Sequence, residues 1–391
     1  MELDPNLKQW APERQKEYID TVLQAGSLAA AAVKLDVNPS VISRSISAVR
    51  KKAAMNGFAP EHDMNKTVPD PFVVRGTSTL YDADVKAKLQ WVKTRLDESK
   101  AREAIEEWIG WLVSDAKGLA PVVKPPAFTN DDLLTVYPMG DPHFGMYAWK
   151  PETGDDFDLD IAERLTYAAI DRLVTSAPAS KHALILELGD FFHADDNSAA
   201  TPKSGNRLDV DTRWARVMQV GLRAMVYVIK RTLEKHELVT VRIVAGNHDP
   251  HSSFALALGL DAYFTNETRV TVDLDPNLFW YYRFDKVLIG VAHGDTCKTD
   301  KLPALMACDR PEDWGATQFR YYYHGHIHHD SVKELPGCMV ESFRTLAAKD
   351  AWHTGAGYRS GRDMRCVVHH KKFGEIERHR CDVAMLETKR K

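Results

Sequence analysis

Five short clusters of Asp, His and Asn lie between residues 140 and 328, and each follows an apolar run of strand length. The clusters are Gly140-Asp141-Pro142-His143, Gly189-Asp190-Phe191-Phe192-His193, Gly246-Asn247-His248-Asp249, His293-Gly294-Asp295 and Gly325-His326-Ile327-His328. Taken singly, most of them are typical of a loop or turn, because Gly and Asn tolerate positive φ. Taken together, they place carboxylates and imidazoles where an open α/β sheet forms its binding crevice.

These residue types suit a pair of divalent metal ions that hydrolyses a phosphate ester. Hydrolysis requires neutralised phosphoryl oxygens and a nucleophilic water, and two ions about 3.5–4 Å apart supply both. One carboxylate must bridge the ions, while imidazole and oxygen ligands complete each of them. His326 and His328 are the strongest single signal, because alternate residues of an extended segment point the same way. The sequence has no thiolate cluster, which disfavours structural zinc.

The segments that must position these clusters alternate between strand and helix after Asn130. Strands are predicted over residues 133–139, 183–188, 239–245, 287–292 and 319–323. Helices are predicted over residues 160–173 and 212–235. This alternation indicates an α/β catalytic domain, which we assign to residues 127–391.

The first 56 residues are predicted to form a module of three short helices. Gly26 ends the first helix, and Ser27 and Ser40 are expected to cap the next two. The module resembles a helix-turn-helix, and its third helix exposes Arg44 with no acidic residue from Ser40 to Lys52. We therefore expect it to contact DNA or a partner protein. The alternative is a generic three-helix cap with a solvated basic end.

Residues 57–126 are predicted to connect this module to the catalytic domain. The segment from Gly57 to about Leu80 is interrupted by Pro and Asp, which indicates a linker that could include a short hairpin. Tyr81 to Ser114 has helical spacing of apolar residues and is interpreted as a helical connector. Such a helix would serve as a spacer or as an oligomerisation arm. In the second case the protein would be a homodimer.

The composition limits which partners the protein can bind and indicates its cellular compartment. The formal net charge is −4 and the pI is about 6.5, so attraction to nucleic acid must come from local basic patches. The sequence has no apolar run long enough for a bilayer, and its first ten residues lack the basic and apolar regions that are typical of a signal peptide. Its five cysteines favour reduced thiols over a disulfide framework. We therefore expect a cytoplasmic protein without a membrane anchor.

The ordered motifs resemble those of the calcineurin-like metallophosphoesterase superfamily over residues 131–350. The resemblance implies a four-layer α/β/β/α sandwich and assigns metal ligands by position. The implied ligands of the first ion are Asp141, His143, Asp190 and His328. The implied ligands of the second ion are Asp190 as the bridge, Asn247, His293 and His326. Manganese is the expected ion, with iron, zinc, nickel and magnesium as alternatives.

The same resemblance implies roles for the residues beside the ligands. His248 would lie over the phosphate as proton donor, and Asp249 would orient it. The segment Gly-Asp-Phe-Phe-His resembles the double-strand-break-repair exonuclease branch, in which the histidine, here His193, is needed for nuclease chemistry. The alternative is that His193 is only a partner of a metal ligand.

Basic side chains beside the motifs are candidate DNA contacts. Lys203 and Arg207 lie in a polar insertion after the second motif, which would track a phosphate backbone or form a solvated lid. Arg344 and Arg359 lie in a stretch, residues 341–363, that is rich in basic and aromatic side chains. This mixture suits phosphate contacts and base stacking, or packing at the edge of the sandwich.

The leading hypothesis is therefore a metal-dependent phosphodiesterase that acts on DNA, a nuclease. The whole chain is similar to phage- or prophage-encoded proteins described as DNA-repair exonucleases or metallophosphoesterases, so the compartment would be the host cytoplasm. One alternative is a phosphatase or phosphodiesterase for small nucleotides. A second is a DNA-binding regulator with an inactive phosphoesterase domain, which is disfavoured because every expected ligand is present.

Overall fold

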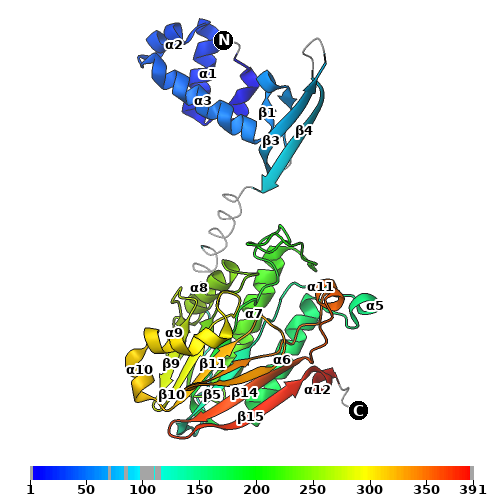
Figure 1. The fold of residues 1–391 in the computed structure, drawn as a ribbon. Coiled ribbons are helices and arrows are strands. Elements are labelled where there is room, and N and C mark those ends of the chain that lie inside the picture. Colours follow the sequence, from blue (N-terminus) through cyan, green and yellow to red (C-terminus); the bar gives the residue numbers. More distant parts are fainter. Residues whose placement is uncertain (1–2, 69–71, 83–86, 97–109, 111–115, 388–391) are drawn as a thin grey trace. The chain divides into compact units, whose positions relative to one another are not determined.

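The computed structural model describes residues 3–68, 72–82, 87–96, 110 and 116–387. The chain divides into two compact units, Met1–Ala104 and Ile105–Lys391, and each is described here by itself (Figure 1). Among the described residues, no helix is both long enough and apolar enough to cross a membrane.

The larger unit is built on two β-sheets. The six-stranded sheet has the order β15-β14-β5-β6-β7-β8, and the five-stranded sheet has the order β12-β13-β11-β10-β9. The strands of the first are β5 (Asn130–Met139), β6 (Ser180–Glu187), β7 (Leu238–Ile243), β8 (Val270–Asp273), β14 (Asp363–His370) and β15 (Gly374–Asp382). Those of the second are β9 (Trp280–Phe284), β10 (Val287–Val291), β11 (Phe319–His324), β12 (Ser331–Leu335) and β13 (Cys338–Ser342).

Helices surround these sheets in the larger unit (Figure 1). The longer ones are α6 (Leu159–Ser176), α7 (Trp214–Leu233), α8 (Ser252–Phe264) and α9 (Leu302–Asp309). The shorter ones are α5 (Lys150–Thr153), η3 (Thr299–Lys301), α10 (Pro311–Ala316), α11 (Ala351–Gly355) and α12 (Val383–Glu387). The predicted helices over 160–173 and 212–235 are confirmed as α6 and α7.

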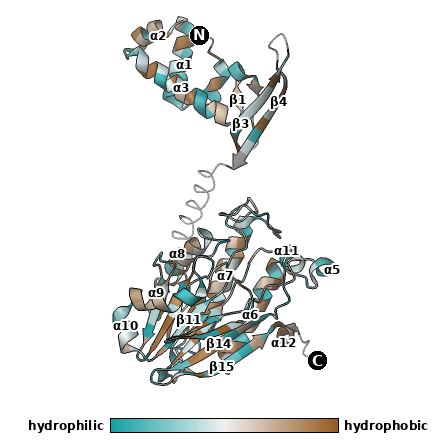
Figure 2. Ribbon diagram, viewed as in Figure 1, coloured by the Kyte–Doolittle hydropathy of each residue, from teal (hydrophilic) through white to brown (hydrophobic). Residues whose placement is uncertain are grey.

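Three apolar clusters separate four layers, as the sandwich prediction requires. One cluster lies between the sheets and joins Leu184 of β6 to Ile289 of β10. A second packs the other face of the six-stranded sheet against α6, α7 and α8. A third packs Leu288 of β10 against Met306 of α9. Successive residues of β10 thus face opposite layers, and Figure 2 shows the apolar strands inside the unit. The four-layer α/β/β/α prediction is confirmed.

Parallel pairing brings the sequence motifs to common edges of the sheets. β5, β6 and β7 pair in parallel, and so do β10 and β11. All five strands match apolar runs predicted from the sequence. Because the chemical clusters follow the carboxyl ends of these strands, the pairing places them beside one another.

The smaller unit begins with η1 (Pro5–Trp10) and three helices, α1 (Glu13–Ala25), α2 (Leu28–Leu35) and α3 (Pro39–Met55). The three predicted helices are confirmed, and Gly26, at φ 70°, ends α1 as expected. Ser27 caps α2 by accepting a hydrogen bond from the backbone N–H of Ala30. The prediction that Ser40 caps α3 is wrong. Asn38 is the cap, because its side chain accepts a hydrogen bond from the N–H of Ser40 at 2.9 Å.

The segment after α3 forms β1 (Phe58–Ala59), η2 (Pro60–His62), β2 (Met64–Asn65) and a hairpin of β3 (Phe72–Tyr81) and β4 (Ala87–Leu96). The helix predicted from Tyr81 is therefore wrong for Ala87–Leu96. Leu89 lies opposite Leu80 in the hairpin, and Gln90 donates a hydrogen bond to Thr79. Cross-strand pairing thus overrides the helical spacing. The rest of that prediction, 97–109 and 111–115, lies outside the described residues.

We expect Leu184→Ala to lower the free energy of unfolding by about 2–5 kcal/mol, because the side chain is fully buried between the sheets. Urea unfolding followed by circular dichroism measures this change. Leu278→Ala is the matched control, since Leu278 is 42% exposed. Equal losses in the two variants would contradict the assignment of this layer as core.

Candidate metal centre

The loops that carry the ligands have an unusual backbone conformation. Positive φ angles between 46° and 68° occur at Asp141, His143, Asp190, His326 and His328. Residues other than Gly adopt this region at a cost, and such strain concentrates at functional sites. The turns are thereby sharp enough to direct successive side chains into one place.

A first group of ligands consists of Asp141, His143 and His328, which offer ligand atoms within 4.8 Å of one another. The Nε2 atoms of the two histidines are 3.1 Å apart, and Asp141 Oδ1 lies 3.5 Å from His328 Nε2. Both oxygens of Asp141 also accept hydrogen bonds from the backbone N–H of His326. These nitrogen and oxygen donors converge as a divalent cation requires.

A second group consists of Asp190, His293 and His326, again with ligand atoms within 4.8 Å. His293 Nε2 lies 3.1 Å from both Asp190 Oδ2 and Asn247 Oδ1. His293 Nδ1 lies 4.0 Å from Asp141 Oδ1, so the two groups adjoin. The structure thus brings together every predicted ligand. The bridging role of Asp190 stays a prediction.

The electrostatics of the second group favour a cation. Burial alone would lower the pKa of His293, but the carboxylates of Asp190 and Asp141 raise it well above its ordinary value. Burial alone would raise the pKa of Asp190, but His293 and the N–H of His248 bring it below its ordinary value. The local field therefore stabilises positive charge, which a divalent ion would supply. The residues present fit the metal pair implied by the sequence.

Glycines allow the chain to close around these carboxylates. A Cβ atom at Gly246 would lie 2.0 Å from Asp190 Oδ1, and one at Gly325 would lie 2.5 Å from Asp141 Oδ2. Both distances are shorter than any tolerable contact, so no other residue fits without moving a ligand. Gly at these two positions is thus required by packing against the candidate ligands.

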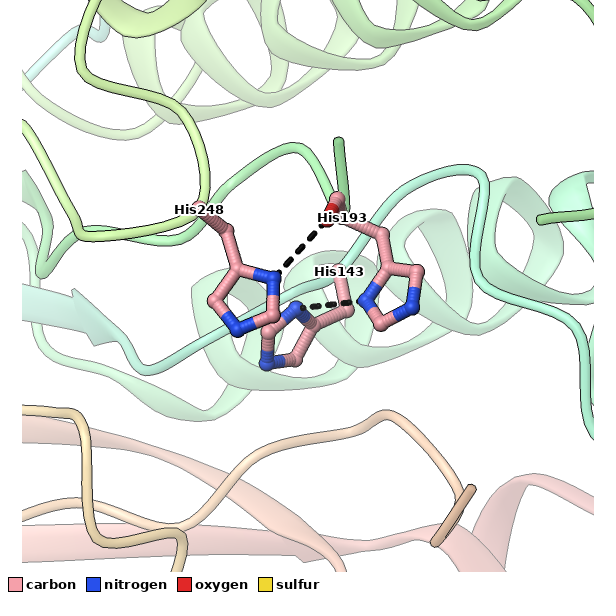
Figure 3. Close-up of side chains that lie close together, drawn as sticks. All are labelled: His143, His193 and His248. Atoms are coloured by element: carbon pink, nitrogen blue, oxygen red, sulfur yellow. Dashed lines mark hydrogen bonds between the residues drawn. The ribbon is translucent and has the colours of Figure 1, made fainter. Parts of the chain in front are cut away.

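His193 lies beside the candidate ligand His143 and beside His248 (Figure 3). Its Nδ1 is 3.3 Å from His143 Nδ1, and its backbone carbonyl accepts a hydrogen bond from His248 Nδ1 at 2.8 Å. If His143 binds metal through Nε2, its Nδ1 is protonated and donates a hydrogen bond to His193 Nδ1. Burial, and then the charge of His248, lower the pKa of His193 to about 3, which keeps the ring neutral.

His248 and Asp249 differ from the arrangement expected for them. Asp249, which the sequence analysis assigned to orient His248, instead accepts hydrogen bonds from the backbone N–H groups of Gly246 and Phe192. The carbonyl of His193 orients His248, whose own N–H donates to Asp190 Oδ1 at 2.8 Å. Asp249 is fully buried and holds two loops together. Burial, and then the charge of Asp190, raise its pKa well above the ordinary value.

Two features escaped the sequence analysis. Glu187, at the end of β6, is fully buried and accepts a hydrogen bond from the N–H of Gly189. Asp350 holds His353 by its backbone N–H and by its Nδ1, both at 2.7 Å. The ring of His353 stacks on the ligand His328, with centroids 4.7 Å apart. The only sequence signal for this support was the spacing Asp-x-x-His.

The candidate DNA contacts occupy different surroundings. Arg207 is exposed and lines a cavity of about 260 Å³ that also contains His248 and His326. Arg344 is instead paired with Asp330 and Asp363, at 3.1 and 2.9 Å, so these carboxylates account for its charge. The others are exposed on the surface: Arg44, Lys203 and Arg359.

No protein-family model and no curated protein matches this chain. Three solved structures illustrate what its fold is similar to. A conserved Streptococcus pneumoniae protein described as a predicted phosphoesterase is 11% identical, with 64% of this chain and 98% of that one covered and a TM-score of 0.27. Zn²⁺-complexed Vps29 from Entamoeba histolytica is 13% identical, with 63% and 98% covered and a TM-score of 0.27. A 5′-nucleotidase from Candida albicans is 10% identical, with 66% and 53% covered and a TM-score of 0.32.

We expect His193→Ala to weaken manganese binding roughly 10–100-fold, as removal of a partner of a metal ligand usually does. Calorimetric titration of metal-free protein measures the affinity. His370→Ala is the control, because that ring stacks on Phe373 and not on a ligand. Unchanged metal affinity together with abolished turnover would show that His193 acts in nuclease chemistry, as the exonuclease resemblance implies, and not only as a partner of a metal ligand.

Proposed function

We propose that this protein is a two-metal phosphodiesterase that cleaves DNA, with manganese as the activating ion. The observation that carries the proposal is that the two groups of candidate ligands adjoin each other and lie beside His248. At TM-scores this low, the similar structures add nothing to it. It depends on the side chains and on the chemistry for which their donors are suited.

Each residue has a role in this proposal. The first ion would be held by Asp141, His143 and His328, and the second by Asp190, Asn247, His293 and His326. Bound ions supply charge neutralisation and an activated water. Because the carbonyl of His193 can only accept, His248 Nδ1 carries a proton and its Nε2 is the nitrogen left for substrate. Protonated at Nε2, His248 would donate to the leaving oxygen.

DNA as substrate is supported by the smaller unit. Helix α3 exposes Arg44, Lys51 and Lys52, while Ile42 and Ile46 are buried in the core of the helical module. A basic helix face without acidic residues attracts a phosphate backbone. Two binding elements on one chain would raise the effective concentration of DNA at the metal centre.

With manganese, the purified protein should degrade labelled linear DNA, and chelation should abolish the activity. His248→Ala should lower kcat about 10²–10⁴-fold, the usual contribution of a general acid, while manganese affinity stays near wild type. Gel analysis of the products and metal titration measure the two effects. Turnover of mononucleotides without cleavage of DNA would overturn the choice of substrate. Loss of metal in His248→Ala would overturn its role.

Replacing both Arg44 and Lys51 by Ala should weaken DNA binding. It should also reduce the slope of log affinity against log salt, by about one for each phosphate that the variant no longer neutralises. Fluorescence anisotropy at several salt concentrations measures this slope. Lys34→Ala, at an exposed position on α2, is the control. An unchanged slope in the double variant would reassign α3 to protein contacts.

A further inference from the structure

An aromatic group lies at the rim of the metal centre, on α11 and the loop that follows it. Trp352 meets His353 edge-on, with centroids 5.0 Å apart and planes at 90°. Tyr358 lies 5.8 Å from Trp352 at a tilt of 38°, and 5.2 Å from His353. Neither ring stacks on the indole, and Trp352 is 65% exposed. One large π face is thus available to a ligand.

This aromatic group is fixed relative to the metal ligands. His353 stacks on His328 at an angle of 18°, and Asp350 holds His353 while its carboxylate caps α11. A base bound to Trp352 would therefore lie on an element that packs against a candidate ligand. Rigid support of this kind is what a positioning element for substrate requires.

Trp352 also shares a cavity with the reacting groups. The cavity of about 260 Å³ is lined by Asn247, His248 and His328 together with Trp352 and Tyr358. Arg207 lines it too, from the polar insertion. A single exposed Trp on a surface is ordinary, but an exposed indole in the cavity of a phosphodiesterase centre matches the combination that binds unpaired nucleotides, a stacking platform beside a phosphate site.

We propose that Trp352 stacks on a nucleobase adjacent to the scissile phosphate, so that the substrate is single-stranded DNA or an unpaired end. The inference deepens the proposed function and rests on it. In a continuous duplex each base is stacked and paired, so it cannot reach the indole without leaving the helix. In a single strand the base is free to lie on the wall of the cavity while its phosphate lies at the metal centre.

Kinetics with manganese on two kinds of ester test the proposal. The p-nitrophenyl phosphate esters of thymidine, at the 5′ and at the 3′ oxygen, carry a base, whereas methyl p-nitrophenyl phosphate has the same leaving group and no base. Trp352→Ala should raise KM for at least one thymidine ester about tenfold, the effect of removing one base stack. The substitution should leave kcat for the thymidine esters unchanged. It should also leave KM and kcat for methyl p-nitrophenyl phosphate unchanged. Trp352→Phe should restore most of the binding, because phenylalanine retains a stacking face.

Phe373→Ala is the matched control, since Phe373 is also 65% exposed but stacks on His370 in the β14–β15 turn. Wild-type protein should also cleave a single-stranded oligonucleotide faster than the same sequence in a blunt duplex. Equal KM changes on all esters, no change on either thymidine ester, or preference for the duplex would overturn the role of Trp352. Failure of wild-type protein to hydrolyse any ester or DNA would overturn the proposed function itself.

Discussion

The carboxylates of Asp141 and Asp190 are buried, and the structure around them is arranged to compensate their charge. An isolated buried carboxylate is strongly unfavourable unless hydrogen bonds or cations satisfy it. Asp141 accepts from the backbone N–H of His326, and Asp190 accepts from that of His248 and lies beside His293. These contacts join loops that are distant in sequence. The same negative charge that draws the loops together would attract divalent metal ions to the candidate site.

This compensation explains the conformation of the chain around the site. The loops must approach the carboxylates so closely that only Gly fits at positions 246 and 325, and the ligands themselves adopt positive φ. Such strain persists only where the surroundings determine the backbone. Here the close-packed layer between the sheets and the fully buried Asp249 supply that constraint.

The sequence was informative where one local pattern dominates. The run 183–188 is apolar except for Glu187 because the strand is covered on both faces, and the polar residues that follow had to lie at the strand end. The sequence was misleading where contacts between distant segments decide the secondary structure. Leu89 and Trp91 fit a helix as well as a strand until β3 pairs with β4. The partner of Asp249 and the stacking of His353 on His328 depend on which loops meet, and spacing along the chain does not record that.

The candidate ligands follow strands of both sheets, whereas the proposed substrate contacts lie outside the sheets. Asp141 and Asp190 follow strands of the six-stranded sheet, and His293, His326 and His328 follow strands of the five-stranded sheet. The complete set of candidate ligands therefore exists only when the two sheets are packed, so a metal bound there would stabilise this packing. Arg207 and Trp352 lie instead on a polar loop and on α11, outside both sheets. Under the proposed function, changes in those segments would alter the choice of substrate while the strands keep the candidate metal centre intact.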